Sequence, residues 1–360
     1  MSHRNVSRRQ LLQTGAGLRA LTLGAAPWLN AQAQPSAAAT AAIATYTGPD
    51  RLKRLMDGAR KEGLLTIYTS APLDDLAALT SAFEAKYGVK SRVWRSGSEK
   101  VLQRGLLEAK AGRFEADAFE TNGPEMEVLH RERILQEVKS PLLAELIPQA
   151  IQPHKEWIAT RLNIFTATYN TKLIKKEDLP KTYRDLLDPK WKGKIAVEAD
   201  DNDWFANILL QMGEAQGIAL FKEIVAKNAV TVRKGHTLLA NLVASGEVPL
   251  ALTLYNYKVE QMKNAGAPVD WVALPPTVVR PNGVGITRSA PHPHAAALFF
   301  EFMMYEGQVI LGKRDFIPTN TKIPSTLNKM PLTFADPRLT LDDGQKWSKI
   351  YEEVFSRKGG

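Results

Sequence analysis

The sequence contains no cysteine among its 360 residues. Disulfide bonds, thiolate metal sites and a cysteine nucleophile are therefore excluded, and the fold must depend on packing and hydrogen bonding. Blocks of consecutive lysine and arginine are also missing, and basic residues are scattered among acidic ones. Because a nucleic-acid partner requires a basic surface that follows the phosphate backbone, we expect no nucleic-acid partner.

Signatures of common enzymes are absent as well. The chain has no Gly-x-Ser-x-Gly elbow, phosphate-binding loop, dinucleotide fingerprint or His-Glu-x-x-His sequence. A catalytic triad can still be assembled from residues far apart in the sequence, so a hydrolase that uses His236 with an acid such as Asp200 remains an alternative. We expect a protein that is not an enzyme.

The first 33 residues have the three parts of a cleavable export signal: an arginine-containing start, a weakly apolar middle and the small-residue site Ala31-Gln32-Ala33. The run Ser7-Arg8-Arg9-Gln10-Leu11-Leu12 resembles a twin-arginine signal, which exports folded proteins. Arg19 interrupts the apolar stretch, which is then too short for a membrane anchor of roughly 20 residues. We therefore expect residues 1–33 to be a twin-arginine-type export signal that directs the chain to the periplasm.

The remaining chain is long enough for two medium-sized domains. Residues 34–47 are rich in alanine, threonine and proline and are predicted to form a flexible leader. No second long apolar run follows, and a hydrophobic content of 44% is ordinary for a globular protein. The formal net charge of +9 overstates the basicity of this part, because the expected signal holds four arginines and no acid.

Short apolar runs alternate with amphipathic stretches in two series. The first series has predicted strands at residues 64–68, 89–94 and 116–120. The second has predicted strands at residues 164–169, 194–198 and 250–254. Helices with apolar residues at helical spacing are predicted between them, at residues 74–86, 99–111 and 205–212, and later at 293–304. This alternation predicts an α/β fold with mostly parallel sheets.

The segment Asp185-Leu186-Leu187-Asp188-Pro189-Lys190-Trp191-Lys192-Gly193-Lys194-Ile195 resembles a signature of bacterial extracellular solute-binding proteins, in the branch associated with iron(III) transport. Trp157-Ile158-Ala159 with Arg161, followed by Tyr169-Asn170-Thr171-Lys172, resembles the family's crossing segment. Pro281-Asn282-Gly283-Val284-Gly285 adds to the resemblance, which extends over nearly the whole chain after the expected signal.

The resemblance implies the type II periplasmic-binding-protein fold, with two α/β lobes and a ligand cleft between them. It implies that lobe one comprises residues 48–160 with 283–360 and that lobe two comprises residues 161–282. The implied function is the periplasmic substrate-binding component of an ABC transporter, which captures a small ligand by hinge closure and delivers it to the membrane permease. We expect a monomer that has this permease as its partner and needs no cofactor. A ligand-sensing module of a membrane receptor is the alternative outside transport.

Ligand-binding residues are expected at the carboxyl ends of strands, where ligands collect in open α/β sheets. In lobe one, these positions are Thr69, Ser70, Ser96, Ser98, Thr121 and Asn122. Backbone N–H groups at helix starts, with hydroxyl groups beside them, suit a carboxylate or phosphate. As the alternative, Ser98 and Thr121 cap their own helices.

In lobe two, the corresponding positions are Glu198, Asp200, Trp204, His236, Thr237, Tyr255 and Tyr257. Phenolate oxygens from Tyr255 and Tyr257 suit ferric iron as the transported ligand, and the resemblance implies a tyrosine pair near this position. Asn256 separates these two tyrosines, whereas the pair is adjacent in the ferric-binding branch. As the alternative, the tyrosines are packing aromatics. Trp204 suits stacking on an organic ligand.

Arg161 and Asn163 lie where the first crossing segment is expected, and Asn282 lies in the second. A guanidinium beside a cleft suits an anion, either the ligand itself or the partner of a metal, and pairing with a neighbouring acid is the alternative. The ligand stays open among ferric iron, an oxyanion or organophosphonate, a carboxylate and a polyamine. We expect removal of the Tyr255 hydroxyl or of Arg161 to weaken binding and to leave the fold intact.

Overall fold

A computed structural model describes residues 36–325 and 330–355 of the chain. The expected export signal lies outside the described residues. Within the described part, every helix is too short or too polar to cross a membrane.

The α-helices span Ala37–Ala44 (α1), Arg51–Glu62 (α2), Leu73–Tyr87 (α3), Ser98–Lys110 (α4), Gly123–Arg131 (α5), Asn202–Met212 (α6), Glu214–Asn228 (α7), His236–Ser245 (α8), Asn256–Asn264 (α9), Pro293–Met304 (α10), Glu306–Gly312 (α11), Pro337–Asp342 (α12) and Gly344–Phe355 (α13). The strands span Leu64–Thr69 (β1), Lys90–Arg95 (β2), Ala118–Asn122 (β3), Leu135–Gln136 (β4), Ile158–Asn170 (β5), Ile195–Glu198 (β6), Thr231–Arg233 (β7), Leu250–Tyr255 (β8), Val269–Val272 (β9), Thr277–Thr287 (β10), Ile317–Pro318 (β11) and Leu332–Phe334 (β12).

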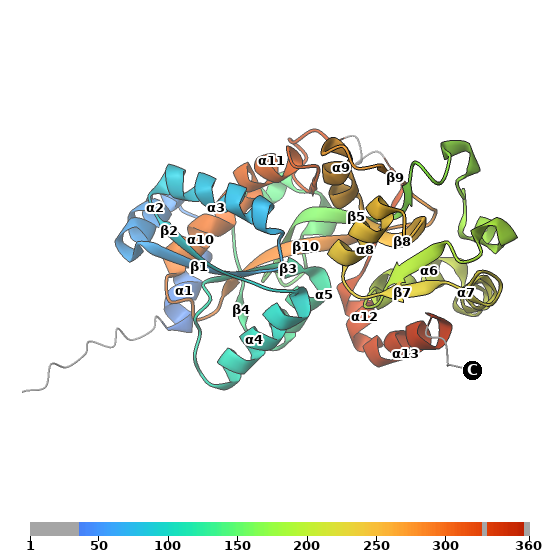
Figure 1. Ribbon diagram of the computed structural model, residues 1–360. Helices are drawn as coiled ribbons and strands as arrows, with labels where there is room; N and C mark the ends of the chain where they lie inside the picture. Colours follow the sequence, from blue (N-terminus) through green and yellow to red (C-terminus); the bar gives the residue numbers. More distant parts are fainter. Residues whose placement is uncertain (1–35, 326–329, 356–360) are drawn as a thin grey trace, which may run out of the picture. The chain divides into compact units, whose positions relative to one another are not determined.

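The main strands follow the order β2-β1-β3-β10-β5-β8-β6-β7 (Figure 1). Strand β1 pairs in parallel with β2 and β3, and β6 pairs in parallel with β7 and β8. Every strand predicted from the sequence has a counterpart among these elements. The α/β architecture predicted from the alternating pattern is therefore confirmed. The sheet is mixed rather than mostly parallel, because the long strands β5 and β10 pair antiparallel with each other, with β3 and with β8.

Helix α3 shows how the local sequence produces an element. Its buried residues include Leu76, Leu79 and Phe83, whose spacing of three and four places them on one face. The helix ends at Gly88, which has φ 71° and therefore adopts the left-handed conformation that glycine tolerates best. The apolar face packs into the core of the first lobe.

Strands β5 and β10 connect two separate hydrophobic cores. The first half of β5 pairs with β10, and its second half pairs with β8 and β9. Ile158 on β5 belongs to the first core and Phe165 to the second, while on β10 Val284 belongs to the first and Val278 to the second. The predicted fold, two α/β lobes linked by two crossing segments, is thus confirmed.

Part of the segment expected to be a flexible leader forms helix α1. The hydroxyl of Ser36 accepts a hydrogen bond from the N–H of Ala39 at 3.2 Å, and Thr40 and Ala44 are buried. Helix α1 packs against α10. Alanine has the highest helix propensity, and burial against α10 supplies the remaining stabilisation that so short a helix needs.

The C-terminal helix α13 packs with the second core, although the resemblance implied that residues 283–360 belong to lobe one. Trp347, Tyr351 and Phe355 are buried in that core, at the four-residue spacing of one helix face. The ring of Phe205 on α6 lies 5.6 Å from Tyr351 and 5.1 Å from Phe355, centroid to centroid. Lobe two therefore includes the C-terminal helix α13 as well as the middle of the chain.

Candidate ligand-binding site

Three polar residues meet where β3, β10 and β5 lie side by side. Asn282 on β10 is the register partner of both Asn122 on β3 and Arg161 on β5. The Nδ2 group of Asn282 donates to Oδ1 of Asn122 at 3.0 Å, and Nδ2 of Asn122 donates to the hydroxyl of Ser98 at 2.9 Å. Antiparallel pairing thus aligns residues that are far apart in the sequence.

A pocket of about 320 Å³ opens at this place and is lined by residues from both lobes. The predicted site residues that line it are Ser70, Ser98, Asn122, Arg161, Asn163, His236, Thr237, Tyr255, Tyr257 and Asn282. Arg95 and Lys258 also line the pocket, although the sequence did not single them out. The position of Arg95 at the pocket follows from strand register alone, because Arg95 is paired with Thr69 at the end of the neighbouring strand.

The lining of the pocket is basic. Arg95, Arg161 and Lys258 contribute to it, and the described lining residues include no aspartate or glutamate. The guanidinium of Arg161 is almost fully buried, and its NH1 group is bound to the carboxylate of Glu120. Its Nε atom is buried and has no hydrogen-bond partner among the described residues. Arg161 therefore combines structural pairing with a place in the pocket lining, and one of its buried N–H groups is left without a partner among the described residues.

Five helices begin at the pocket: α3, α4, α5, α8 and α9. Their N-cap residues, which all line the pocket, are Pro72, Gly97, Asn122, Gly235 and Tyr255. None of these N-caps makes a side-chain capping hydrogen bond. Backbone N–H groups and the positive ends of helix dipoles are therefore presented to the pocket, an environment that favours an anion.

The alternative in which Ser98 and Thr121 cap their own helices is wrong. Ser98 is the first residue of α4, after the N-cap Gly97, and its hydroxyl accepts from Asn122. Thr121 precedes the N-cap of α5 and is buried outside the pocket lining, where its hydroxyl lies 2.9 Å from that of Ser70. Both hydroxyls instead hold neighbouring pocket residues in place.

Thr69, Ser96 and Glu198 also lie behind the pocket. The hydroxyl of Thr69 is buried and donates to Glu120, and the N–H of Ser96 donates to the carbonyl of Thr69 at 3.1 Å. The carboxylate of Glu198 is buried and accepts the backbone N–H of Gly235 at 2.7 Å. These residues, expected to contact ligand directly, instead support the loops that line the pocket.

The structure contradicts ligand contact by Trp204 and Asp200. The ring of Trp204 is fully buried on α6 and packs against Tyr183 and Phe221, so it cannot stack on a ligand. Asp200 is largely exposed and lies 3.8 Å from Lys234, outside the pocket lining. An indole that appears at a strand end in the sequence becomes a core residue because the helix turns its side chain inward.

Tyr255 is held by a buried ionic cluster. Arg280 on β10 donates to the hydroxyl of Tyr255, from Nε to Asp203 at 2.6 Å, and from NH2 to Asp201 at 3.1 Å. The Nε2 atom of His236 lies 3.0 Å from Asp201, and the His236 ring stacks on Tyr255 at 4.5 Å between centroids. Sequence reasoning missed this cluster, although an arginine inside an otherwise apolar strand signals a buried partner.

Both pocket tyrosines hold their protons firmly. Burial raises the pKa of Tyr257 to about 12, and it raises the pKa of Tyr255 well above its ordinary value despite the nearby positive charge of Arg280. Asn256, which separates the two tyrosines, is buried and accepts the N–H of Ile164 on β5 at 3.0 Å. A metal ion that bound the phenol oxygens would have to displace these protons.

His236 is expected to make anion binding in the pocket depend on pH. Burial alone would lower the pKa of His236, but the carboxylates of Asp201 and Glu198 outweigh burial and the charge of Arg280, and raise it above the ordinary value of 6.5. An anion favours the protonated ring, so we expect its affinity to fall about tenfold from about pH 6 to about pH 8. Calorimetric titration over this range measures the effect, and His236→Gln, measured with the same anion, should flatten the profile. An equally steep profile in that variant would assign the effect to another group.

Pocket residues contributed by two crossing strands and by helix starts of both lobes define a solute-binding protein. The chain belongs to the family described as bacterial extracellular solute-binding proteins, which matches residues 123–343, more than half of its length. The resemblance inferred from residues 157–195 and 281–285 is thereby confirmed.

The similar proteins include the Fe(3+)-binding periplasmic protein of Serratia marcescens, which is 25% identical over 310 residues, covering 82% of this chain and 90% of that protein. Among solved structures, iron-bound HitA from Pseudomonas aeruginosa has a TM-score of 0.71 at 21% identity and covers 81% of this chain and 99% of that one. AfuA from Actinobacillus pleuropneumoniae, with exogenous fructose-6-phosphate bound, has a TM-score of 0.71 at 23% identity, covering 82% and 99%. These two likenesses establish the two-lobed fold.

Proposed function

We propose that this chain is the substrate-binding component of an ABC importer and that its pocket binds a small solute through an anionic group. Membership in the solute-binding family supports the role. The convergence of five uncapped helix starts with Arg95, Arg161 and Lys258 on one pocket carries the ligand class. The extracellular character of the family supports a periplasmic location, which the expected twin-arginine signal would provide.

Capture follows from residues of both lobes facing one ligand. Ser70 and Ser98 come from the first lobe, His236 and Tyr255 come from the second, and Arg161 lies on the crossing strand β5. A ligand that contacts both sides at once favours the closed form by the difference in its contacts between the open and closed forms. The permease then receives the closed, loaded protein.

Ferric iron is the second candidate, favoured by Tyr255 and Tyr257, whose rings lie 5.9 Å apart in the same pocket. The relative from Serratia marcescens, which is named as Fe(3+)-binding, also supports it. The hydroxyl of Tyr255 is bound to Arg280, and the described lining has no carboxylate. We therefore propose that iron would enter together with an oxygen-rich anion, which the arginines and helix starts would hold.

Thermal-shift and calorimetric titrations with inorganic phosphate, a sugar phosphate, citrate and ferric citrate test both candidates. At a hundred times its Kd, a ligand of the folded state adds about 2.7 kcal/mol to the free energy of unfolding. We expect at least one iron-free anion to stabilise the protein, and Tyr257→Phe to retain this binding. If iron is the cargo, ferric citrate should produce a visible tyrosinate-to-iron absorption band that the same variant weakens. Stabilisation by a polyamine and by none of the anions would contradict the proposed ligand class.

A further inference from the structure

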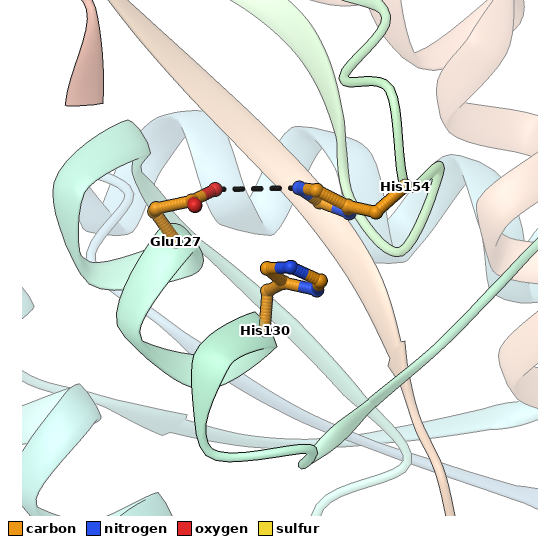
Figure 2. Close-up of side chains that lie close together, drawn as sticks. All are labelled: Glu127, His130 and His154. Carbon is orange, nitrogen blue, oxygen red and sulfur yellow. Dashed lines mark hydrogen bonds and ion pairs between the residues drawn. The ribbon is translucent and has the colours of Figure 1, made fainter. Parts of the chain in front are cut away.

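Glu127, His130 and His154 lie close together in lobe one (Figure 2). None of them lines the ligand pocket. Glu127 and His130 come from α5, and His154 comes from the loop that precedes β5. One carboxylate oxygen of Glu127 and one nitrogen from each imidazole ring all lie within 4.8 Å of one another. Three donors at this separation are close enough to hold one metal ion, and the transport role does not use them.

Local structure explains how the donors converge. The three-residue spacing of Glu127 and His130 places both on one face of α5. The turn from Gln152 to Lys155, closed by a backbone hydrogen bond of 3.0 Å, presents His154 to that face. The side chain of Glu127 is only 5% exposed, while those of His130 and His154 are 26% and 18% exposed. A dissolved ion therefore reaches the imidazoles, and the carboxylate is already held in place.

The cluster also has orienting contacts around it. The Nδ1 atom of His130 lies 2.8 Å from the carboxylate of Glu156, which in turn binds Arg288 at 3.1 Å. A proton on Nδ1 that is donated to Glu156 leaves Nε2 of His130 with its lone pair free, the form that binds a metal. Trp157 donates from Nε1 to Glu127 at 3.4 Å. Carboxylates that orient a histidine in this way are typical of protein metal sites.

We propose that Glu127, His130 and His154 bind one divalent transition metal ion of the zinc type. Two imidazoles and one carboxylate match the ligand chemistry of zinc, and solvent would complete four coordination. The ion would join α5 to the segment leading into β5, the strand that carries Arg161. The site is separate from the pocket, because none of the three residues belongs to its lining.

Binding requires a defined local change at His154. Its Nδ1 atom accepts the backbone N–H of Glu156 at 3.0 Å, so the ring proton lies on Nε2, which faces Glu127 at 3.3 Å. The rings of His130 and His154 are stacked at 3.5 Å with 10° between their planes. On binding, the Nε2–H bond breaks, Nδ1 takes up a proton, and a bond forms between Nε2 and the metal. The rings must then turn, and the contact with the N–H of Glu156 is lost.

Calorimetric titration with zinc chloride tests the site. The exported protein is purified without a histidine tag and treated with EDTA before titration. We expect one zinc ion per chain and at least a hundredfold weaker binding in both His130→Gln and His154→Gln. Glu156→Gln keeps all three proposed ligands but weakens the contacts of Glu156 with His130 and Arg288, and it should weaken binding by about tenfold to a hundredfold. If a histidine variant does not fold, as judged by circular dichroism, Glu127→Gln replaces it and should weaken binding comparably.

His236→Gln is the matched control, because Glu198, Asp201 and His236 form a second group of close donors. Zinc affinity should be unchanged in this variant. Loss of zinc binding in His236→Gln, with retention in the His130 and His154 variants, would overturn the proposal. A folded wild-type protein that binds no zinc would do the same.

Discussion

Replacing Arg161 by methionine is expected to weaken ligand binding by about 3 kcal/mol, on the order of a hundredfold, and also to destabilise the fold. Arg161 lines the pocket, so the variant removes a positive charge that the proposed anion would contact. It also leaves Glu120 without its charged partner, in a setting where both side chains are 3% exposed. Breaking such a pair from one side costs about 3–5 kcal/mol of unfolding free energy.

Glu120→Gln separates the two effects of Arg161. This variant breaks the same ion pair and should lower the free energy of unfolding to a similar extent, but it keeps the guanidinium and should therefore keep ligand affinity. Calorimetry with the stabilising anion and denaturation in urea measure the two quantities. Equal losses of affinity in both variants would show that Arg161 acts only through the fold. The simpler expectation from the sequence, that Arg161 can be removed with the fold intact, is not supported by this pairing.

Arg280→Met is expected to lower the free energy of unfolding by about 3–5 kcal/mol. Arg280 is 7% exposed and is bound to Asp201 and Asp203, whose side chains are 1% and 4% exposed. Without the guanidinium, two buried carboxylates face each other and Tyr255 loses the donor to its hydroxyl. Urea denaturation followed by circular dichroism measures the loss.

Lys346→Met is the control for removal of a charge, because the pair between Lys346 and Glu214 is 43% and 39% exposed. Its effect should stay within about 1 kcal/mol. Adding Asp203→Asn to Arg280→Met should restore part of the lost stability, since it removes one of the uncompensated charges. An Arg280→Met protein as stable as the wild type would contradict a stabilising role for the cluster.

Much of the binding site was predictable because strand ends and helix starts are local properties of the sequence. Ser98 and Asn122 follow predicted strands, and parallel strands of one sheet bring such ends to the same edge. His236 and Tyr255 were found in the same way in the second lobe. The side-chain direction at these ends was not predictable from the sequence. For this reason Trp204 was expected at the ligand, whereas its ring is buried in the core.

Residues whose role depends on a distant partner were missed. Arg280 acquires its function from Asp201 and Asp203, more than 70 positions away, and Glu120 meets Arg161 only because β10 lies between their strands. The cluster of Glu127, His130 and His154 is also invisible in the sequence, since a loop brings the third residue to the helix.

The sequence was sufficient to predict the alternation of strands and helices from periodicity and the absence of any thiol chemistry from composition. It was also sufficient to predict the family, from contiguous motifs. The tertiary structure alone decided which polar residues share the pocket, which charges neutralise one another and which lobe receives the C-terminal helix. These outcomes depend on strand register and on desolvation, and both arise only when segments far apart in the chain are packed together.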